Sequence, residues 1–339
     1  MTKQTSKNFA LALGLLGLAL IPSTSLAQVG LASKLPGKNP ATAAAQAASH
    51  QAKAPGYPSY TYTLLSFPGA LLTSATSINL GAATSKTEIV GGYGPPEQGN
   101  LAQGGFLARV SGTKTVTETY KAVNYPHLPQ DQIALGVNDS GQIVGAYYTS
   151  ADVFYGYELS GGKFSTLSVP GSDGTLALGI NNSGEVVGYW GTSGGPTEGF
   201  MLIGGTYTSF NYPGASATLP ISVNNEGEIV GNYTDTSGVT HGFSLSGGTY
   251  TSFDVPGSVG TYAEGINDAG NIVGTYCTTA ECISTYEGMQ GFLLSNGAFT
   301  TIAVPGESYT WVNGINNNGV VVGYYQDAAG LTVSFLATP

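Results

Sequence analysis

Residues 179–188 read Gly-Ile-Asn-Asn-Ser-Gly-Glu-Val-Val-Gly, and this stretch decides the fold because it recurs along the chain. Its general form is Gly-[Ile/Val]-Asn-x-x-Gly-x-[Ile/Val]-Val-Gly, and the commonest spacing between copies is 43 residues. Fixed periods of this length are typical of solenoids, propellers and repeat arrays. The central Asn of the motif occupies Asn138, Asn181, Asn224, Asn267 and Asn316, with a degenerate copy at Asn79.

Two further patterns repeat with the same period. A Gly-aromatic pair recurs at Phe106, Tyr157, Phe200, Phe243 and Phe292, with a Ser-Phe variant at Phe335. A Pro closes a segment rich in Tyr, Thr, Ser and Phe at Pro68, Pro126, Pro170, Pro213, Pro256 and Pro305. Six copies of one unit therefore fill the chain from Tyr60 to its last residue.

One copy, residues 175–213, divides into four short strands. The predicted strands are residues 175–181, 185–190, 199–203 and 206–212. Short turns join the first strand to the second and the third to the fourth, and the last strand shows the period-2 alternation of a half-buried strand. Four antiparallel strands in about 43 residues match one blade of a propeller.

The two ends of the repeat region complement each other. The chain stops after a third strand at residues 333–337, whereas residues 59–69 look like a fourth strand without its first three. Together they make one full blade, which leaves no open edge at the seam. The predicted fold is all-β: a six-bladed β-propeller of four-stranded antiparallel blades over residues 59–339, closed by the N-terminal strand pairing with the C-terminal blade.

The N-terminal region predicts export. Residues 1–27 have the basic start, apolar stretch and Ser-Leu-Ala cleavage site of a signal peptide, so Gln28 is the predicted mature N-terminus. A retained anchor is the alternative, but the apolar run is short for a membrane span. Residues 28–58 are rich in Ala, Gln, Lys and Pro and are predicted to be a flexible leader. The protein is expected to be secreted, extracellular or periplasmic, without a membrane anchor and monomeric.

Cysteine usage agrees with export. Cys277 and Cys282 are five residues apart, and in a secreted chain we predict that they form a local disulfide. Half of a metal site is the alternative, but no His or second Cys pair completes it. No metal site or cofactor is therefore expected, although calcium held by carboxylates and carbonyl oxygens stays open.

The charge balance limits the partners. The formal net charge is −10, and Arg109 is the only arginine. Nucleic-acid binding needs clustered Lys and Arg, so nucleic acid is not an expected partner. A sialidase-type site, which holds a carboxylate substrate with several arginines, is excluded for the same reason.

The repeat resembles the HAF-repeat family of secreted bacterial proteins, which is named for a His-Ala-Phe element at the third strand. Here the element reads His-Gly-Phe at residues 241–243 and Gly-Phe or Gly-Tyr in most other copies. The resemblance covers nearly all of residues 60–339 and is carried most specifically by the Gly-Ile-Asn motif. It implies a repeat architecture and carries no activity, and most copies here lack the usual His and Ala.

One face of the predicted propeller is expected to carry function. The loops from strand four to strand one and from strand two to strand three vary in length and share a face, and variable loops on rigid repeats are where binding sites occur. These loops are acidic and aromatic, which suits sugar rings and their hydroxyls. They hold or adjoin Asp131, Asp152, Asp173, Glu198, Asp235, His241, Glu281, Glu287, Glu307, Tyr309 and Asp327.

Four residues break the repeat at one place. Glu264 replaces the Leu or Ile of other copies, Tyr262 and Trp311 replace Leu, and Asn313 lies level with Glu264 in the next blade. We predict a ligand site around these four residues at the mouth of the central channel, with Tyr309 and His241 on the same face. The alternative for Glu264 is a solvated carboxylate at that mouth.

Residues present in every copy are interpreted as structural. The repeated Asn is predicted to form a turn through its side chain. The aromatic residues that follow each Val-Gly pair are predicted to pack between blades. These are Tyr93, Tyr147, Trp190, Tyr233, Tyr276 and Tyr325.

Two functions remain open from the sequence. The first is a non-catalytic secreted propeller that binds an extracellular polysaccharide or a protein ligand at the acidic, aromatic face. The second is a glycan-active hydrolase or lyase, with Glu264 as acid or base and Glu307 or Asp131 as its partner. We favour binding, because no catalytic constellation in the sequence is specific.

Overall fold

The computed structural model describes residues 50–51, 60–70, 72–81, 86–94, 104–111, 117–127, 132–149, 153–327 and 332–339. Within these residues the elements are β-strands, apart from the short helix α2 (Ala280–Thr285). The predicted signal peptide and most of the predicted leader lie outside the described residues. No helix in the described part of the chain is long and apolar enough to cross a membrane.

Most of the strands form five consecutive units of four. Unit one is β3 (Leu72–Ile78), β4 (Thr87–Gly94), β5 (Gly104–Ser111) and β6 (Thr117–Val123). Unit two is β7 (Gln132–Val137), β8 (Ile143–Tyr148), β9 (Phe154–Ser160) and β10 (Lys163–Leu167). Unit three is β11 (Gly174–Ile180), β12 (Val186–Gly191), β13 (Thr197–Ile203) and β14 (Thr206–Phe210). Unit four is β15 (Ala217–Val223), β16 (Ile229–Thr234), β17 (Thr240–Ser246) and β18 (Thr249–Phe253). Unit five is β19 (Gly260–Ile266), β20 (Ile272–Cys277), β21 (Gln290–Ser295) and β22 (Ala298–Ile302).

Unit six is assembled from both ends of the chain. It contains β23 (Thr310–Ile315), β24 (Val321–Gln326) and β25 (Thr332–Thr338), and its fourth strand is β2 (Thr61–Leu65). β2 is antiparallel to β25, with Thr61 opposite Thr338 and Leu65 opposite Ser334. The predicted pairing of the N-terminal strand with the last strand is therefore present. The two-residue strand β1 (His50–Gln51), within the segment predicted to be a leader, pairs with the outer edge of β2.

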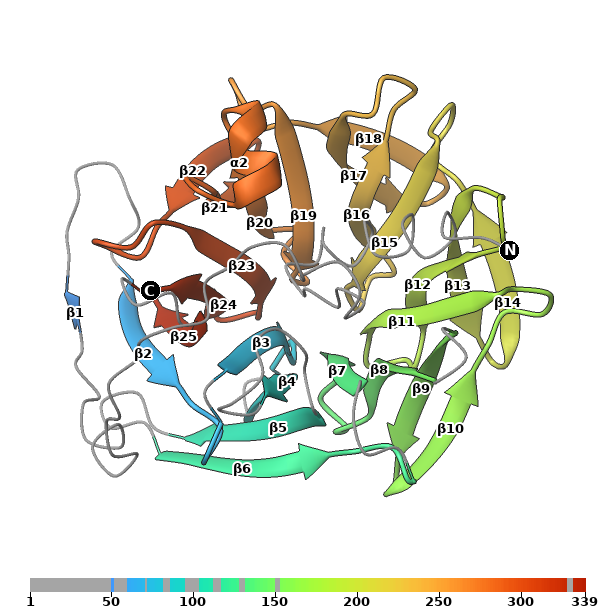
Figure 1. Ribbon diagram of the computed structural model, residues 1–339, viewed down its shortest axis with the longest axis horizontal. Helices are drawn as coiled ribbons and strands as arrows, with labels where there is room; N and C mark the ends of the chain where they lie inside the picture. The colour runs from blue at the N-terminus through green and yellow to red at the C-terminus, as the bar shows by residue number, and fades with distance from the viewer. Residues whose placement is uncertain are drawn as a thin grey trace, which may run out of the picture.

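The six units follow one another around a common centre (Figure 1). Each unit is an antiparallel sheet, and a single parallel bridge between β13 and β15 joins units three and four. Unit six packs against unit one: the Ser334 hydroxyl accepts from the Ala75 amide and donates to the Thr73 carbonyl, both at 2.7 Å. The first strand of each unit lies nearest the centre and the fourth lies outermost (Figure 1).

The Gly of the second strand and the aromatic residue of the third strand recur together because they pack against each other. Gly188 of β12 lies opposite Phe200 of β13, and the Phe200 ring covers the space where a Gly188 side chain would lie. A Cβ on Gly188 would also lie only 2.0 Å from the Leu176 carbonyl oxygen, so no larger residue fits. The repeated aromatic residues, each paired with a Gly of the preceding strand, are fully buried: Phe106, Tyr157, Phe200, Phe243, Phe292 and Phe335.

The repeated Asn forms the turn between strands one and two, as predicted. The Asn181 Oδ1 accepts from the backbone amides of Ser183 and Glu185, both at 3.0 Å. The same side chain also links two units, because its Nδ2 donates to the carbonyl of Asn224 at 3.0 Å. Equivalent bonds run from Asn138 to Asn181, from Asn224 to Asn267 and from Asn267 to Asn316. We call this run of side-chain bonds the asparagine belt.

Asn181→Ala is expected to lower the free energy of unfolding by about 2–3 kcal/mol, since it removes acceptors for two amides and one donor between units. Ser183→Ala is the control, because Ser183 is exposed in the same turn and only its backbone amide bonds to Asn181. Denaturant unfolding measures both variants. An Asn181→Ala midpoint equal to that of Ser183→Ala would show that the belt contributes nothing to stability.

Candidate functional site

The six inner strands meet around a central cavity. Each of them contains a β-bulge at the same position, where one residue is left out of the ladder. Such a bulge redirects a side chain, and here each bulged residue lines a central cavity that is partly open to solvent. The six bulged residues are Thr76, Leu135, Leu178, Ile221, Glu264 and Asn313.

The cavity has an aliphatic half and a polar half. The bulged residues of units two, three and four are Leu135, Leu178 and Ile221, which belong to one hydrophobic cluster. Units five, six and one contribute Glu264, Asn313 and Thr76 instead. Glu264, Asn313 and Thr76 therefore form one polar arc in a ring of bulged residues whose other half is aliphatic.

Glu264 is buried in this arc. Its exposed fraction is 4%, so the interpretation as a solvated carboxylate at the channel mouth is wrong. Burial raises the pKa of the Glu264 carboxyl well above its usual value. Its Oε1 has no hydrogen-bond partner among the described residues. Glu264 is therefore a desolvated carboxyl at a cavity wall.

Tyr262 and Trp311 lie side by side, as predicted, with ring centroids 6.4 Å apart. They are only 2% and 1% exposed, respectively. Trp311 also stacks on Tyr324 at 5.9 Å with an interplanar angle of 6°. The predicted ligand-stacking pair is thus part of the packed interior and offers no ring face to solvent.

Helix α2 and a disulfide pack with these aromatic rings. Cys277 and Cys282 are bonded, with an S–S length of 2.06 Å, so the predicted disulfide is present. Thr279 caps α2 by accepting from the Cys282 amide. The two cysteines, Met289, Tyr262, Trp311 and Tyr324 form one buried cluster, against which Tyr286 and Tyr309 pack.

Of the other predicted site residues, only Asn313 shares the cavity with Glu264. Asn313 lies beside Glu264 on the cavity wall, and its Nδ2 donates to the Ala75 carbonyl at 2.6 Å. Tyr309 is half-buried beside the cluster under α2. Glu307 is half-buried, and its charge acts on Tyr325 rather than at the cavity. Asp131 lies outside the described residues.

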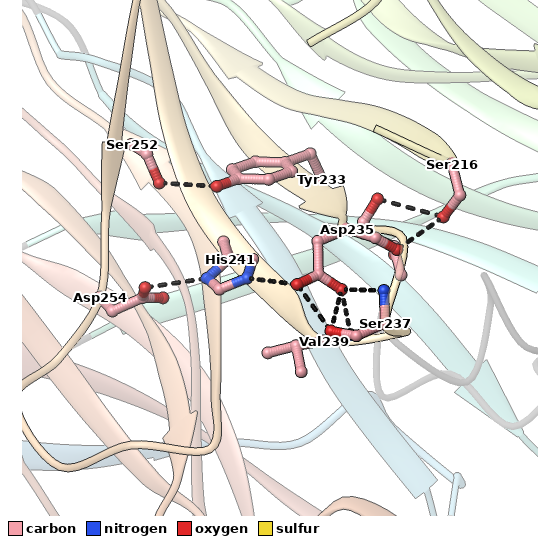
Figure 2. Close-up of polar contacts among 9 residues, drawn as sticks. Ser216, Tyr233, Asp235, Ser237, Val239, His241, Ser252 and Asp254 are labelled. Carbon is pink, nitrogen blue, oxygen red and sulfur yellow. Dashed lines mark hydrogen bonds and ion pairs between the residues drawn. The ribbon is translucent and has the colours of Figure 1, made fainter. Parts of the chain in front are cut away.

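His241 belongs to a separate, accessible group on unit four (Figure 2). Its Nδ1 is 2.8 Å from Asp254 Oδ2, and its Nε2 is 3.6 Å from Asp235 Oδ2. The imidazole therefore lies between two carboxylates, one from the loop after β16 and one from the loop after β18. The side chains of His241, Asp235 and Asp254 are 21%, 35% and 43% exposed.

Aromatic stacking fixes the imidazole. Tyr233 stacks on His241 with ring centroids 5.0 Å apart, and Tyr212 of unit three stacks on Tyr233 with ring centroids 3.7 Å apart. Tyr93 on Phe67 and Tyr147 on Tyr125 repeat the contact at other unit boundaries, so the predicted packing of this aromatic position between units is confirmed. We call Tyr212, Tyr233, Asp235, His241 and Asp254 the His241 cluster.

Asp235 is held as an ionised acceptor. One of its oxygens accepts from the Val239 and Ser237 amides, at 2.9 and 2.8 Å, and from the Ser237 hydroxyl at 2.8 Å. These bonds, led by those from Val239 and Ser237, lower the pKa of Asp235 to about 2. The exposed side chain of Val239 lies next to His241 (Figure 2), so an apolar surface borders the carboxylates.

Sequence reasoning selected His241 but missed Asp254. The pairing of Gly242 with Phe253 places residues 241 and 254 opposite each other at the open end of the β17–β18 hairpin. The Gly247-Gly248 turn would have given that register, because it fixes how the two strands align.

Among the described residues, no three or more His, Cys, Asp or Glu side chains are grouped to hold a metal ion.

Arg109 forms a 2.7 Å ion pair with Glu88 in unit one, so the guanidinium of the single arginine already has a carboxylate partner.

No protein-family model matches the chain. No curated protein matches it either. Among solved structures, it is similar to a mutant of AofleA from Arthrobotrys oligospora in which arginines are replaced by alanine, with 13% identity, a TM-score of 0.51, and coverage of 86% of this chain and 90% of that one. It is also similar to a fungal lectin from Aleuria aurantia, described as a six-bladed β-propeller with a novel fucose recognition mode. The sequence identity is 14% and the TM-score 0.51, and the match covers 79% of this chain and 93% of the lectin.

The chain is also similar to Trypanosoma rangeli sialidase in complex with sialic acid, at 9% identity and a TM-score of 0.51. That match covers 79% of this chain and about half, 54%, of the sialidase. At these identities the likenesses concern the fold, which is that of β-propellers.

Proposed function

We propose that this chain is a secreted, six-bladed β-propeller of the HAF-repeat type that binds a glycan through the His241 cluster on its loop face. The Gly-Ile-Asn repeat supports the family, and the N-terminal signal pattern together with the disulfide supports secretion. The pairing of β2 with β25 supports closure of the ring. The similarity to structures of the Aleuria aurantia lectin supports glycan as the ligand class.

The observation that carries the proposal is the exposed, prearranged His241 between two carboxylates. Asp235 is fixed by its loop and His241 by stacking, so little side-chain freedom is lost when a ligand binds. Asp254 is the most exposed of the three and bonds to His241 through one oxygen, which leaves the other oxygen for a ligand hydroxyl. Val239 offers an adjoining apolar surface for the C–H face of a sugar.

The same geometry favours binding over catalysis. Both ring nitrogens of His241 face carboxylates, and the Ser237 hydroxyl donates to Asp235 rather than to His241. No nucleophile is therefore activated by the imidazole in the described site. The catalytic alternative needs two carboxyl groups across a bound sugar, whereas Glu264 is buried and Glu307 lies beside Tyr325.

Asp254→Asn and His241→Ala are expected to weaken glycan binding by at least about tenfold. The first removes a carboxylate acceptor, and the second removes the imidazole that bonds to that carboxylate. The measurement is a glycan array on the purified mature protein, begun with α-methyl-L-fucoside because a lectin neighbour is solved with that compound. Lys163→Ala is the control, since Lys163 is exposed at the tight turn between β9 and β10 on the opposite face.

A reducing-end release assay on the same protein separates the two functions. Glycan binding without release supports the proposal. Release that survives Asp254→Asn but is lost in Glu264→Gln would favour the enzyme. Glycan binding unchanged in both His241-cluster variants would move the site elsewhere.

A further inference from the structure

The central cavity has a polar arc that the proposed glycan site does not use. Asn313 uses its amide donor on the Ala75 carbonyl, at 2.6 Å. Thr76 uses its hydroxyl proton on the Ala134 carbonyl, at 2.8 Å. What these side chains leave for the cavity is oxygen lone pairs: Oδ1 of Asn313 and Oγ1 of Thr76. The Glu264 carboxyl, with Oε1 unpartnered among the described residues, is the third oxygen source.

An arc of hydrogen-bond acceptors favours a ligand that is positively charged or that donates hydrogen bonds. No Lys, Arg or His is among the described residues that line the cavity, so Glu264 has no built-in counter-ion there. A buried carboxylate without a partner is costly, and it stays protonated unless a cation accompanies it. The titratable groups that interact with Glu264 are Tyr262 of β19 and Tyr324 of β24. Burial and, to a smaller extent, the charge of Glu264 raise the pKa of both phenols, so both are neutral at physiological pH.

We propose that this cavity is a binding site for a small cation, held by the oxygens of Glu264, Asn313 and Thr76. The Ser77 and Ser222 residues line the same cavity and bring further oxygen atoms to it. Hard cations such as Ca²⁺ take oxygen ligands of these kinds, and a protonated primary amine would use the same acceptors. The aliphatic half formed by Leu135, Leu178 and Ile221 excludes water from one side of the bound ion.

Binding exchanges one ion for one proton. The cation enters as the Glu264 carboxyl ionises, and the released proton passes to solvent. The raised folded pKa means that deprotonation without a cation costs stability as the pH rises above the usual Glu value. Cation affinity should therefore increase from about pH 5 to about pH 8.

The test is a thermal-shift titration of the full mature protein after dialysis against EDTA. About 10 mM CaCl₂ should raise the melting temperature by about 3 °C near pH 8 and by less than about 1 °C near pH 5. Glu264→Gln, which keeps the shape but cannot ionise, should abolish the shift. Glu226→Gln removes a carboxylate from an exposed turn and should retain it. Parallel titrations with NaCl, KCl and methylammonium chloride at equal ionic strength distinguish metal ions from an amine.

Glu264→Leu provides a second variant that is expected to fold. It restores the residue that units two and three carry at this position, Leu135 and Leu178. Its melting temperature without cation should exceed that of the wild type near pH 8, and it should not respond to any cation. The proposal is overturned if no cation shifts the wild type, if the shift persists in Glu264→Gln, or if it is equal at both pH values. A response to methylammonium alone supports it and identifies the ion as an amine.

Discussion

Deleting residues 59–69 is expected to abolish cooperative unfolding and to cause aggregation. The deletion removes β2, whose Tyr62 and Leu65 are buried against the last unit, and exposes the ladder of β25 over five residue pairs. A bare, flat strand edge pairs with other chains. The loss of two large buried side chains and their ladder is worth at least about 5 kcal/mol, comparable to the whole stability of many domains. Calorimetry and light scattering measure both consequences.

The control is a deletion of residues 28–58, which keeps β2. It removes β1, which contributes only the two pairs His50–Tyr62 and Gln51–Thr61 at the outer edge. Its melting temperature should stay within about 2 °C of the full mature chain. If the deletion of 59–69 melts like the parent, β2 does not complete the ring.

Phe200→Ala is expected to lower the free energy of unfolding by about 4 kcal/mol. Phe200 is fully buried, covers Gly188 on the neighbouring strand and meets Tyr207 edge-on at 5.5 Å. Truncation leaves a cavity that Gly188 cannot fill, and large cavities in a core cost about 3–5 kcal/mol. Denaturant unfolding with a fitted slope measures the change.

Unit two supplies the matched control, Phe200→Tyr. There the equivalent Tyr157 is fully buried and donates its hydroxyl to the Ile133 carbonyl at 3.0 Å. The Leu176 carbonyl lies in the same place in unit three, so the added hydroxyl has an acceptor and the change should cost less than about 1 kcal/mol. A Phe200→Ala cost as small as that would show that this aromatic position does not hold the unit together.

The strands and their pairing were predictable because the six copies of the repeat can be aligned with one another. Six copies of one unit show which residues are constant, and constant residues such as Asn181 and Phe200 proved structural. The second bond of Asn181, to Asn224 of the next unit, was not predictable. Its existence depends on how closely neighbouring units approach, which no local pattern records.

The site was predictable only in part. Glu264 and Asn313 do line one cavity, and Tyr262 and Trp311 do lie in one buried cluster. Each pair occupies equivalent positions on the inner strands of two adjacent units, which is why its members are neighbours. Their burial was missed. Unit five carries a long insertion between β20 and β21, and its helix and disulfide pack on the aromatic rings. The sequence shows the length of that insertion but not the direction in which it folds.

The split unit has a consequence for how the chain could be rearranged. Thr61 and Thr338 are paired neighbours, so the first and last strands of the ring meet at one place. No unit is then structurally the first. The two chain ends could lie in a different unit without changing the order of the units. A circularly permuted gene, with these ends fused and a new break in any tight hairpin, would encode the same set of contacts.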